Sequence, residues 1–570
     1  MSATPTSFDA DRPGPETPAT AGARAVLTRL YRRDLPGYPA TGRRMGYLAI
    51  VVITTVVLYY MLYIQYAVAT SIITHFDMTY RYFVWVSVIG NAVGAFASLV
   101  AGLADRWGRA NLVVYGLLVA SLLVFFGLPN AGGKATYLVL FALVSFIEGI
   151  VLVATPALIR DFSPQLGRAT AMGAWTMGPV IGSLVVTTVT SSTLDSSSWQ
   201  DEVRYSGLAG LAVFVVAVLA LRELSPGLRD QIMVSLRDRA LVEARAKGIE
   251  PAAARRGEWR QMLRPDVTGS ALAISLFLLL YFAAVGNFVV FFATTFGYSE
   301  QRANAVANWY WAPNAIALVA AGLLSDRIKV RKPFMVVGAV GSIVMTAIFA
   351  SRATHPGTGY YTFAWLFVGI GVFSAIAYAP WMAGFTETVE KHNPAATATG
   401  LAVWGWTIRI VVAVSSALIP VLVTSVTPLV DHGPQVTAAQ AQAGPALAIV
   451  NAHPQLFAEL GAYPPGKAPA TLTAQALREV GPADLAVVQK AQPQLAVLNQ
   501  YGAKVQKAAA DVPDQWRTWW WICVGGQVLF LPFVFLMAGR WSPRKAREDA
   551  ELHRVAVERE LAELTAQRAT

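Results

Sequence analysis

The chain has 570 residues, of which 55% are hydrophobic and only 14% are charged. This composition is too apolar for a soluble globular protein and indicates a bundle of membrane-spanning helices, because irregular backbone leaves its polar groups unpaired in lipid. The single cysteine, Cys523, excludes an intramolecular disulfide and a cysteine-ligated metal cluster, and the net charge of +11 lies in short loops, which argues against nucleic-acid binding.

Twelve apolar segments follow a polar N-terminal tail, residues 1–44, which lacks the order of a signal peptide. The segments cover residues 46–73, 80–104, 110–129, 135–158, 168–192, 205–222, 268–296, 304–325, 333–351, 361–386, 397–425 and 516–539. Each is long enough for a helix to cross the hydrocarbon layer. The sequence therefore predicts an all-α membrane protein of 12 transmembrane helices, with both termini on one side.

Basic residues indicate which side that is. Arginines and lysines concentrate in alternate loops, for example at Arg106, Arg160 and Arg327, whereas the loops between them carry about one each. By the positive-inside rule, the basic loops and both termini are cytoplasmic. The chain is therefore predicted to be a multi-pass protein of the cytoplasmic (inner or plasma) membrane.

Two regions outside the membrane interrupt the pattern. Residues 223–267 are charge-rich and amphipathic, which predicts a cytoplasmic central loop with amphipathic helices. Residues 427–514 have helical periodicity broken by Pro and Gly, which predicts an extracytoplasmic helical insertion, although a surface insertion without a role explains them equally well. The other predicted parts are an N-terminal six-helix bundle at 45–222, helices seven to eleven at 268–426, helix twelve at 515–540 and a cytoplasmic helical tail at 541–570.

Two internal echoes indicate a duplicated unit. "AGLADRWGR" at 101–109 is echoed by "AGLLSDRIKVRK" at 321–332, with the Asp-Arg pairs 221 residues apart, and "ATAMGAW" at 169–175 is echoed by "ATATGLAVW" at 396–404, with an offset of 227. Two tandem halves of six helices explain both offsets, and transporters with such halves hold their substrate at midplane between them.

The stretch at 101–109 fits the motif G-x-L-A-D-R-x-G-R except that Ala101 stands at the first glycine. This stretch, its weaker copy after the eighth segment and the six-plus-six layout resemble the Major Facilitator Superfamily. This resemblance implies that the motif loop locks the cytoplasmic ends of the halves together in one conformation and releases them in another. The gating residues it implies are Asp105, Arg106, Gly108 and Arg109, with Asp326 and Arg327 in the copy. The copy has Lys329 in place of the motif glycine, so we expect it to lack the glycine turn and to matter less.

The positive-inside rule alone also explains the arginines of the motif, as anchors of a cytoplasmic loop. It does not explain Asp105, whose carboxylate suits the N-terminus of a helix from the other half. Asp105 is therefore the residue on which the gating hypothesis depends.

Two ionisable residues lie near the middle of apolar segments. Charges at this depth are costly unless they face a cavity or a partner, so each marks a candidate functional site. Glu148 is predicted to couple transport to protons, because a buried carboxyl can exchange one in the physiological range. Arg409 is predicted to bind an anionic substrate group, as a basic residue in the same helix does in organic-anion exchangers of the superfamily. A structural salt bridge between Glu148 and Arg409 is the alternative.

Aromatic and amide side chains are candidates for the rest of the substrate site, since a mainly apolar pocket with a few polar groups suits small organic ligands. These are Tyr63, Gln65, Asn287, Trp311, Asn314 and Trp381. Helix packing or anchoring at the lipid interface explains any single one of them better, and as a set they argue against a path for inorganic ions. Gly178, Pro179 and Gly182 match the G-P-x-x-G core typical of proton-coupled antiporters in the superfamily, with close helix packing as the alternative.

Together these features predict a secondary active transporter of a small organic solute, proton-coupled and operating by the rocking of two halves. Uptake of an organic acid and export of a drug-like compound are equally compatible with the sequence. We expect no cofactor, no metal and no enzymatic activity, because neither a phosphate-binding loop nor a catalytic cluster is present in the sequence. The expected partners are the substrate, protons and the lipid bilayer, and the chain is expected to be a monomer. A transporter-like sensor or assembly protein acting through residues 427–514 is the alternative.

Overall fold

The computed structural model describes residues 31–99, 108–163, 173–225, 262–355, 357–393, 397–464 and 467–569, together with residues 228, 242 and 245. Asp105 and Arg106 lie outside the described residues, as does most of the predicted central loop. The described part is almost entirely helical, with one two-stranded sheet.

The N-terminal helix group comprises the helices before the central loop. They are α2 (Thr41–Ala67), α3 (Ala69–His75), α4 (Tyr80–Leu99), α6 (Arg109–Leu122), α7 (Lys134–Phe162), α9 (Gly178–Thr193) and α10 (Trp199–Ala220), with short irregular turns at Leu123–Gly127 and Leu128–Asn130. The first predicted segment is thus divided at Val68 into α2 and α3.

The C-terminal helix group follows the central loop. It comprises α14 (Ser270–Phe277), α15 (Leu279–Phe296), α16 (Glu300–Ile328), α17 (Lys332–Arg352), α18 (Tyr360–His392), α19 (Thr397–Leu422) and α25 (Ala503–Leu536), preceded by a π-helical turn at Pro265–Gly269. The seventh predicted segment is divided at Leu278 into α14 and α15.

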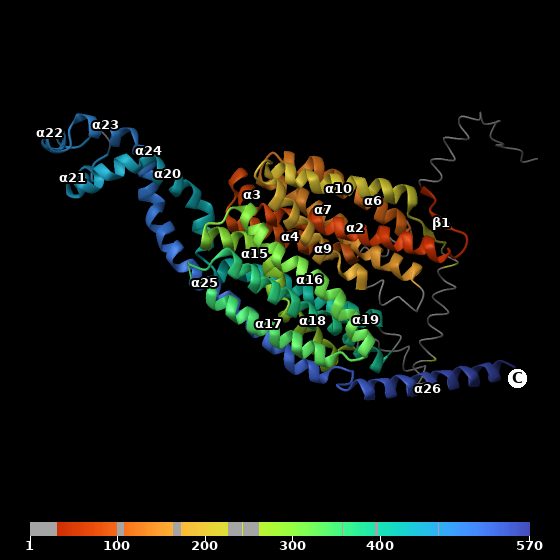
Figure 1. Ribbon diagram of the computed structural model, residues 1–570. Helices are drawn as coiled ribbons and strands as arrows, with labels where there is room; N and C mark the ends of the chain where they lie inside the picture. The colour runs from red at the N-terminus through yellow and green to blue at the C-terminus, as the bar shows by residue number, and fades with distance from the viewer. Residues whose placement is uncertain are drawn as a thin grey trace, which may run out of the picture.

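Residues 427–514 are mostly helical where described. They contain most of α20 (Val426–Ala452), all of α21 (Pro454–Gly461), α22 (Ala470–Glu479), α23 (Pro482–Lys490) and α24 (Gln492–Val497), a π-helical turn at Leu498–Gly502 and the start of α25. Figure 1 shows these helices extending away from the bundle at one end, whereas strand β1 (Asp34–Leu35) and the C-terminal helix α26 (Pro543–Ala569) lie at the opposite end. We call these the insertion end and the tail end.

Nine helices of the described part are long and apolar enough to cross a membrane. The other three predicted segments coincide with α4, α9 and α16, which are also helical. The helix α9 in the fifth segment is only 16 residues long, and α16 contains Pro313 and several polar residues. The helical membrane fold predicted from the sequence is confirmed at this level.

Local sequence explains several helix ends. Ser198 caps α10 by accepting a hydrogen bond from the Asp201 N–H, while the Asp201 carboxylate accepts one from the Ser198 N–H in return. Ser299 caps α16 in the same sense, and Gly297 ends α15 in the left-handed conformation with φ of 64°. These turns place the loops between spans where the apolar runs stop.

At the tail end, β1 pairs in parallel with β2 (Glu223–Leu224), so that Asp34 lies opposite Glu223. Arg33 is 1% exposed and donates hydrogen bonds to the carbonyl oxygens of Val218 and Leu221, where α10 ends and its last carbonyls lack partners within the helix. Residues just before the first span therefore bind the end of the sixth.

The buried apolar residues divide unevenly. One cluster runs through the N-terminal group, where it includes Leu48. It continues into the insertion-end part of the C-terminal group, where it includes Phe288 and Trp520. A second cluster, which includes Phe277 and Phe530, lies within the C-terminal group alone. The two groups thus share a continuous apolar core at the insertion end.

Candidate substrate and gating site

Glu148 lies near the middle of α7 and is 2% exposed. Both of its carboxylate oxygens are buried without a hydrogen-bond partner among the described residues. The next residue, Gly149, faces α4 so closely that a β-carbon there would lie 2.3 Å from the Gly94 carbonyl oxygen. A carboxyl group is thus held in a tightly packed interior, where its charged form is costly unless a proton or a cation joins it.

The charge of Glu148 affects three tyrosines of α2. Tyr59, Tyr63 and Tyr66 are spaced along one face of the helix, and each interacts with the charge of Glu148. The ring centroids of Tyr59 and Tyr63 are 5.3 Å apart, and those of Tyr63 and Tyr66 are 6.4 Å apart. The result is a row of aromatic rings with polar tips that leads along α2.

Arg409 on α19 interacts electrostatically with the same tyrosine, Tyr59. Tyr59 in turn interacts with Tyr281 on α15 and Tyr378 on α18, again in the C-terminal group. Tyr59 therefore interacts with Glu148 from its own group and with Arg409 from the other. The direct salt bridge between Glu148 and Arg409 is not formed, because the oxygens of Glu148 have no hydrogen-bond partner.

A small cavity lies between the groups, lined by α2, α9, α15 and α16. Tyr63 and Trp311, both predicted for the substrate site, are among its lining residues, with Ser183, Thr187 and Asn304. Its volume of about 20 Å³ has room for a water molecule but not for an organic solute. The cavity is too small for an organic solute to occupy it in this conformation.

Other residues predicted for the substrate site have packing partners. The side chain of Asn314 on α16 donates a hydrogen bond of 2.9 Å to the Gly371 carbonyl oxygen on α18, within one group. Trp381 is fully buried and stacks on Phe385. These contacts favour helix packing as their role.

The two predicted amide residues near α2 and α4 differ in their contacts. Gln65 is 2% exposed and accepts a hydrogen bond from the Tyr137 hydroxyl, while its side-chain nitrogen is buried without a partner. Asn287 accepts a hydrogen bond of 3.0 Å from the Tyr80 hydroxyl, which comes from the other helix group. Asn287 thus belongs to a contact between groups.

The G-P-x-x-G residues pack α9 against α2. A β-carbon at Gly178 would lie 2.6 Å from the Thr55 methyl carbon, and one at Gly182 would lie 2.6 Å from the Tyr59 β-carbon. Pro179 stands in the first turn of α9, where a missing N–H costs nothing. The motif is a close helix contact directly beside Tyr59.

The described part of the motif loop begins at Gly108. Gly108 has φ of 86°, and the Glu223 carboxylate occupies the space of its absent side chain and accepts a hydrogen bond of 2.7 Å from the Arg109 N–H. The Arg109 guanidinium donates to both oxygens of Asp161 on α7, at 2.8 and 2.9 Å. Gly108 and Arg109 thus connect the start of α6 to the ends of α7 and α10.

The second copy repeats this arrangement. Arg331 forms an ion pair of 3.0 Å with Glu387 on α18 and one of 2.6 Å with Asp326, whereas Arg327 is exposed. Lys329, at the position of the motif glycine, is left-handed with φ of 61° and ψ of 30°, whereas Gly108 has φ of 86° and ψ of 135°. The copy thus has a positive φ at this position without the backbone conformation of the glycine turn, and its lesser importance stays a prediction.

Asp161 and Glu387 were not among the residues predicted from the sequence, although their spacing could have identified them. They are 226 residues apart, close to the offsets of the two echoes that identified the repeat. Glu223 gave no such signal, because it has no counterpart in the other half.

A Major Facilitator Superfamily model matches residues 51–307. The match covers 257 of the 570 residues. It supports the family resemblance predicted from the motif, and it indicates a transporter rather than an enzyme. No curated protein among those compared matches the chain in sequence.

The fold of the chain is similar to solved transporter structures. Two are crystal structures of a bacterial homologue of the human lysosomal transporter Spinster, both inward-facing. The occupied form has a TM-score of 0.53 and 15% identity over 87% of this chain and 97% of that chain, and the unoccupied form has a TM-score of 0.53 and 15% identity over 89% and 100%. A crystal structure of a D-xylose-proton symporter has a TM-score of 0.50 and 15% identity over 65% and 89%.

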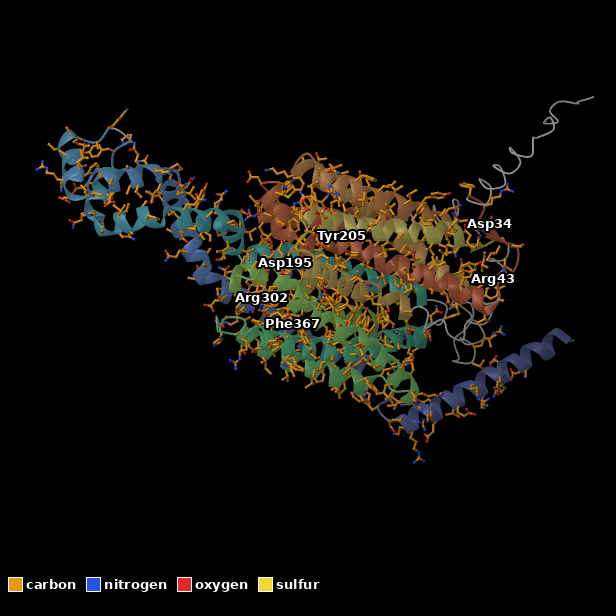
Figure 2. The ribbon with its side chains drawn as sticks, turned by 45° about the horizontal axis from the view of Figure 1, so that its top comes forward. Asp34, Arg43, Asp195, Tyr205, Arg302 and Phe367 are labelled. Carbon is orange, nitrogen blue, oxygen red and sulfur yellow. The ribbon has the colours of Figure 1, made fainter. Side chains whose placement is uncertain are left out.

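Several hydrogen bonds join the two helix groups at the insertion end. The Asn304 side chain donates to the Ala67 carbonyl oxygen, and Asn308 accepts a hydrogen bond of 2.6 Å from the Thr187 hydroxyl. Glu300 accepts hydrogen bonds from Ser71 across the same boundary. Figure 2 shows Arg302, two residues from Glu300, on the side toward the insertion. Asp34 and Arg43 lie at the tail end in the same view. The insertion end is thus closed by polar contacts as well as by the apolar core.

Proposed function

We propose that the chain is a proton-coupled secondary transporter of a small organic solute that works by alternating access. The observation that supports this most directly is Glu148, a carboxyl group 2% exposed with neither oxygen hydrogen-bonded. A buried carboxylate without a partner is costly, so uptake of a proton is favoured when no other cation is present. Tyr59 interacts with the charges of both Glu148 and Arg409. A proton on Glu148 can therefore change how strongly Arg409 binds an anionic solute.

The proposed cycle uses two six-helix halves with the tail end in the cytoplasm, in a monomer of the cytoplasmic membrane. The basic loops support this orientation, and β1 and α26 lie at one end as an even number of spans requires. The closed insertion end corresponds to an inward-facing state, as in the similar Spinster homologue structures. Release of the contacts at the insertion end would expose Tyr63 and Trp311 to the outside.

The substrate is best sought with a thermal-shift screen of mono- and dicarboxylates and of aromatic amines, because a bound substrate stabilises the folded state. The solute that stabilises the protein is then tested in proteoliposomes that contain a pH-sensitive dye. We expect Glu148→Gln to abolish proton movement and accumulation while solute exchange continues. Glu202→Gln is the matched control, since Glu202 is also buried but accepts hydrogen bonds from Thr193 and Ser197. Unchanged proton movement in Glu148→Gln would refute the coupling role.

A further inference from the structure

The first turns of the insertion contact the N-terminal helix group. Asp431 on α20 accepts a hydrogen bond of 2.7 Å from the backbone N–H of Tyr80, the first residue of α4. We propose that the insertion root, residues 426–432, is part of the gate at the insertion end and that Asp431 is its gating residue. This goes beyond the proposed transport function, on which it rests, by giving residues 427–514 a role in the cycle.

The insertion root is fixed to the C-terminal group. The rings of His432 and Tyr501 stack with centroids 4.0 Å apart, which ties α20 to the turn before α25. The N–H of Ser425 donates a hydrogen bond of 2.9 Å to the Gln515 side chain on α25. Asp431 therefore moves with α25 and the C-terminal group when the two groups separate.

Tyr80 is held at two points by the C-terminal group. Its N–H is bound by Asp431, and its hydroxyl donates a hydrogen bond of 3.0 Å to Asn287 on α15. The side chain is 1% exposed, so water does not compete for these bonds while the gate is closed. Separation of the groups at this end must break both bonds and expose the tyrosine.

Charge strengthens the contact. The first N–H groups of a helix have no partner within the helix and carry partial positive charge, so a carboxylate at the start of α4 is favourable. Burial raises the pKa of Asp431 and the nearby Asp77 adds to that shift, whereas the hydrogen bond from Tyr80 and the nearby His432 and Lys504 oppose it. The hydrogen bond from Tyr80 thus offsets part of the cost of burying the charged form.

Glu300 uses the same chemistry at a second place. Its carboxylate accepts hydrogen bonds from the Ser71 N–H at 2.9 Å, the Ser71 hydroxyl at 2.6 Å and the Thr70 hydroxyl, all in the first turn of α3. Two carboxylates of the C-terminal group thus bind the starts of two consecutive helices of the N-terminal group. The repetition supports a clasp between groups, of which Asp431 is the part supplied by the insertion.

The test measures the distance between the groups at the insertion end and needs no substrate. Cys523→Ser removes the only native thiol, and Asp195→Cys with His355→Cys places spin labels on exposed loops of the two groups. Distances are measured by double electron-electron resonance in lipid nanodiscs. We expect Asp431→Ala to raise the long-distance population several-fold. Asp484→Ala removes an exposed acid at the far end of the same insertion and should leave the distribution unchanged.

Two further variants keep the proposal falsifiable. Tyr80→Phe removes only the hydroxyl bond to Asn287 and should shift the distribution in the same direction, as should Asp431→Asn if the alanine variant fails to fold. An unchanged distribution in the Asp431 variants, with a shift in Glu300→Gln, would overturn the role of the insertion root and leave the transport proposal intact. A distribution that no variant and no stabilising solute changes would contradict alternating access itself.

Discussion

Two related ion pairs at the tail end should differ in strength, because their burial differs. Arg109 and Asp161 are 14% and 7% exposed and 2.8 Å apart, whereas Arg331 and Glu387 are 14% and 42% exposed and 3.0 Å apart. For the buried pair, Coulomb's law with an effective dielectric constant of about 20 gives a gross attraction of about 6 kcal/mol. For the more exposed pair, the dielectric constant of water, about 80, gives about 1 kcal/mol. Desolvation reduces both values.

Double-mutant cycles with alanine at each position isolate the pair energies from other contacts, such as that of Arg331 with Asp326. Loss of one partner from a buried pair costs about 3–5 kcal/mol, while exposed pairs contribute about 0.2–1 kcal/mol. We expect a coupling of about 3 kcal/mol for Arg109–Asp161 and less than about 1 kcal/mol for Arg331–Glu387. Unfolding in mixed detergent micelles, followed by circular dichroism, provides the free energies. Couplings equal within 0.5 kcal/mol would refute the reasoning from burial.

Three further predictions concern stability. Lys329→Gly should stabilise the protein by about 1 kcal/mol, because glycine adopts φ of 61° without strain; a lower unfolding free energy would contradict this. Gly149→Ala should destabilise it by about 1–3 kcal/mol by forcing α7 away from α4, whereas Gly286→Ala, with open space around it, should not lower its melting temperature. Asn314→Ala should cost about 1–2 kcal/mol through its lost bond to Gly371, and a lowered substrate affinity at unchanged stability would instead place Asn314 in the substrate site.

Much of the fold could be predicted because span length and charge act locally along the sequence. A helix of roughly twenty apolar residues is needed to cross lipid whatever surrounds it, and the described helices lie where such runs occur. The breaks at Val68 and Leu278 could not be predicted, since both residues are apolar and stand inside uninterrupted apolar runs.

The candidate site was less predictable, because it depends on which helices meet. Glu148 could be singled out by its depth alone, yet nothing in the sequence indicates that Glu148 and Arg409 interact with the same tyrosine, Tyr59. Glu300 illustrates the difficulty: an acid in the first turn of a helix after Ser299 is fully explained by local capping and the helix dipole. Its contact with Ser71 arises only when two distant segments are packed together.

The closed insertion end also sets a requirement on the motif loop at the tail end. A transporter must keep its two states within a few kcal/mol of each other, yet opening at the insertion end breaks the hydrogen bonds of Asp431 and Glu300. Contacts of similar strength must therefore form at the tail end, and Asp105 is the acid predicted to make one. On this reasoning Asp105→Asn favours the state closed at the insertion end and Asp431→Ala favours the other. The double variant should return the spin-label distances toward those of the protein without either substitution. If the two single variants instead shift the distances in the same direction, contacts at the two ends do not favour opposite states.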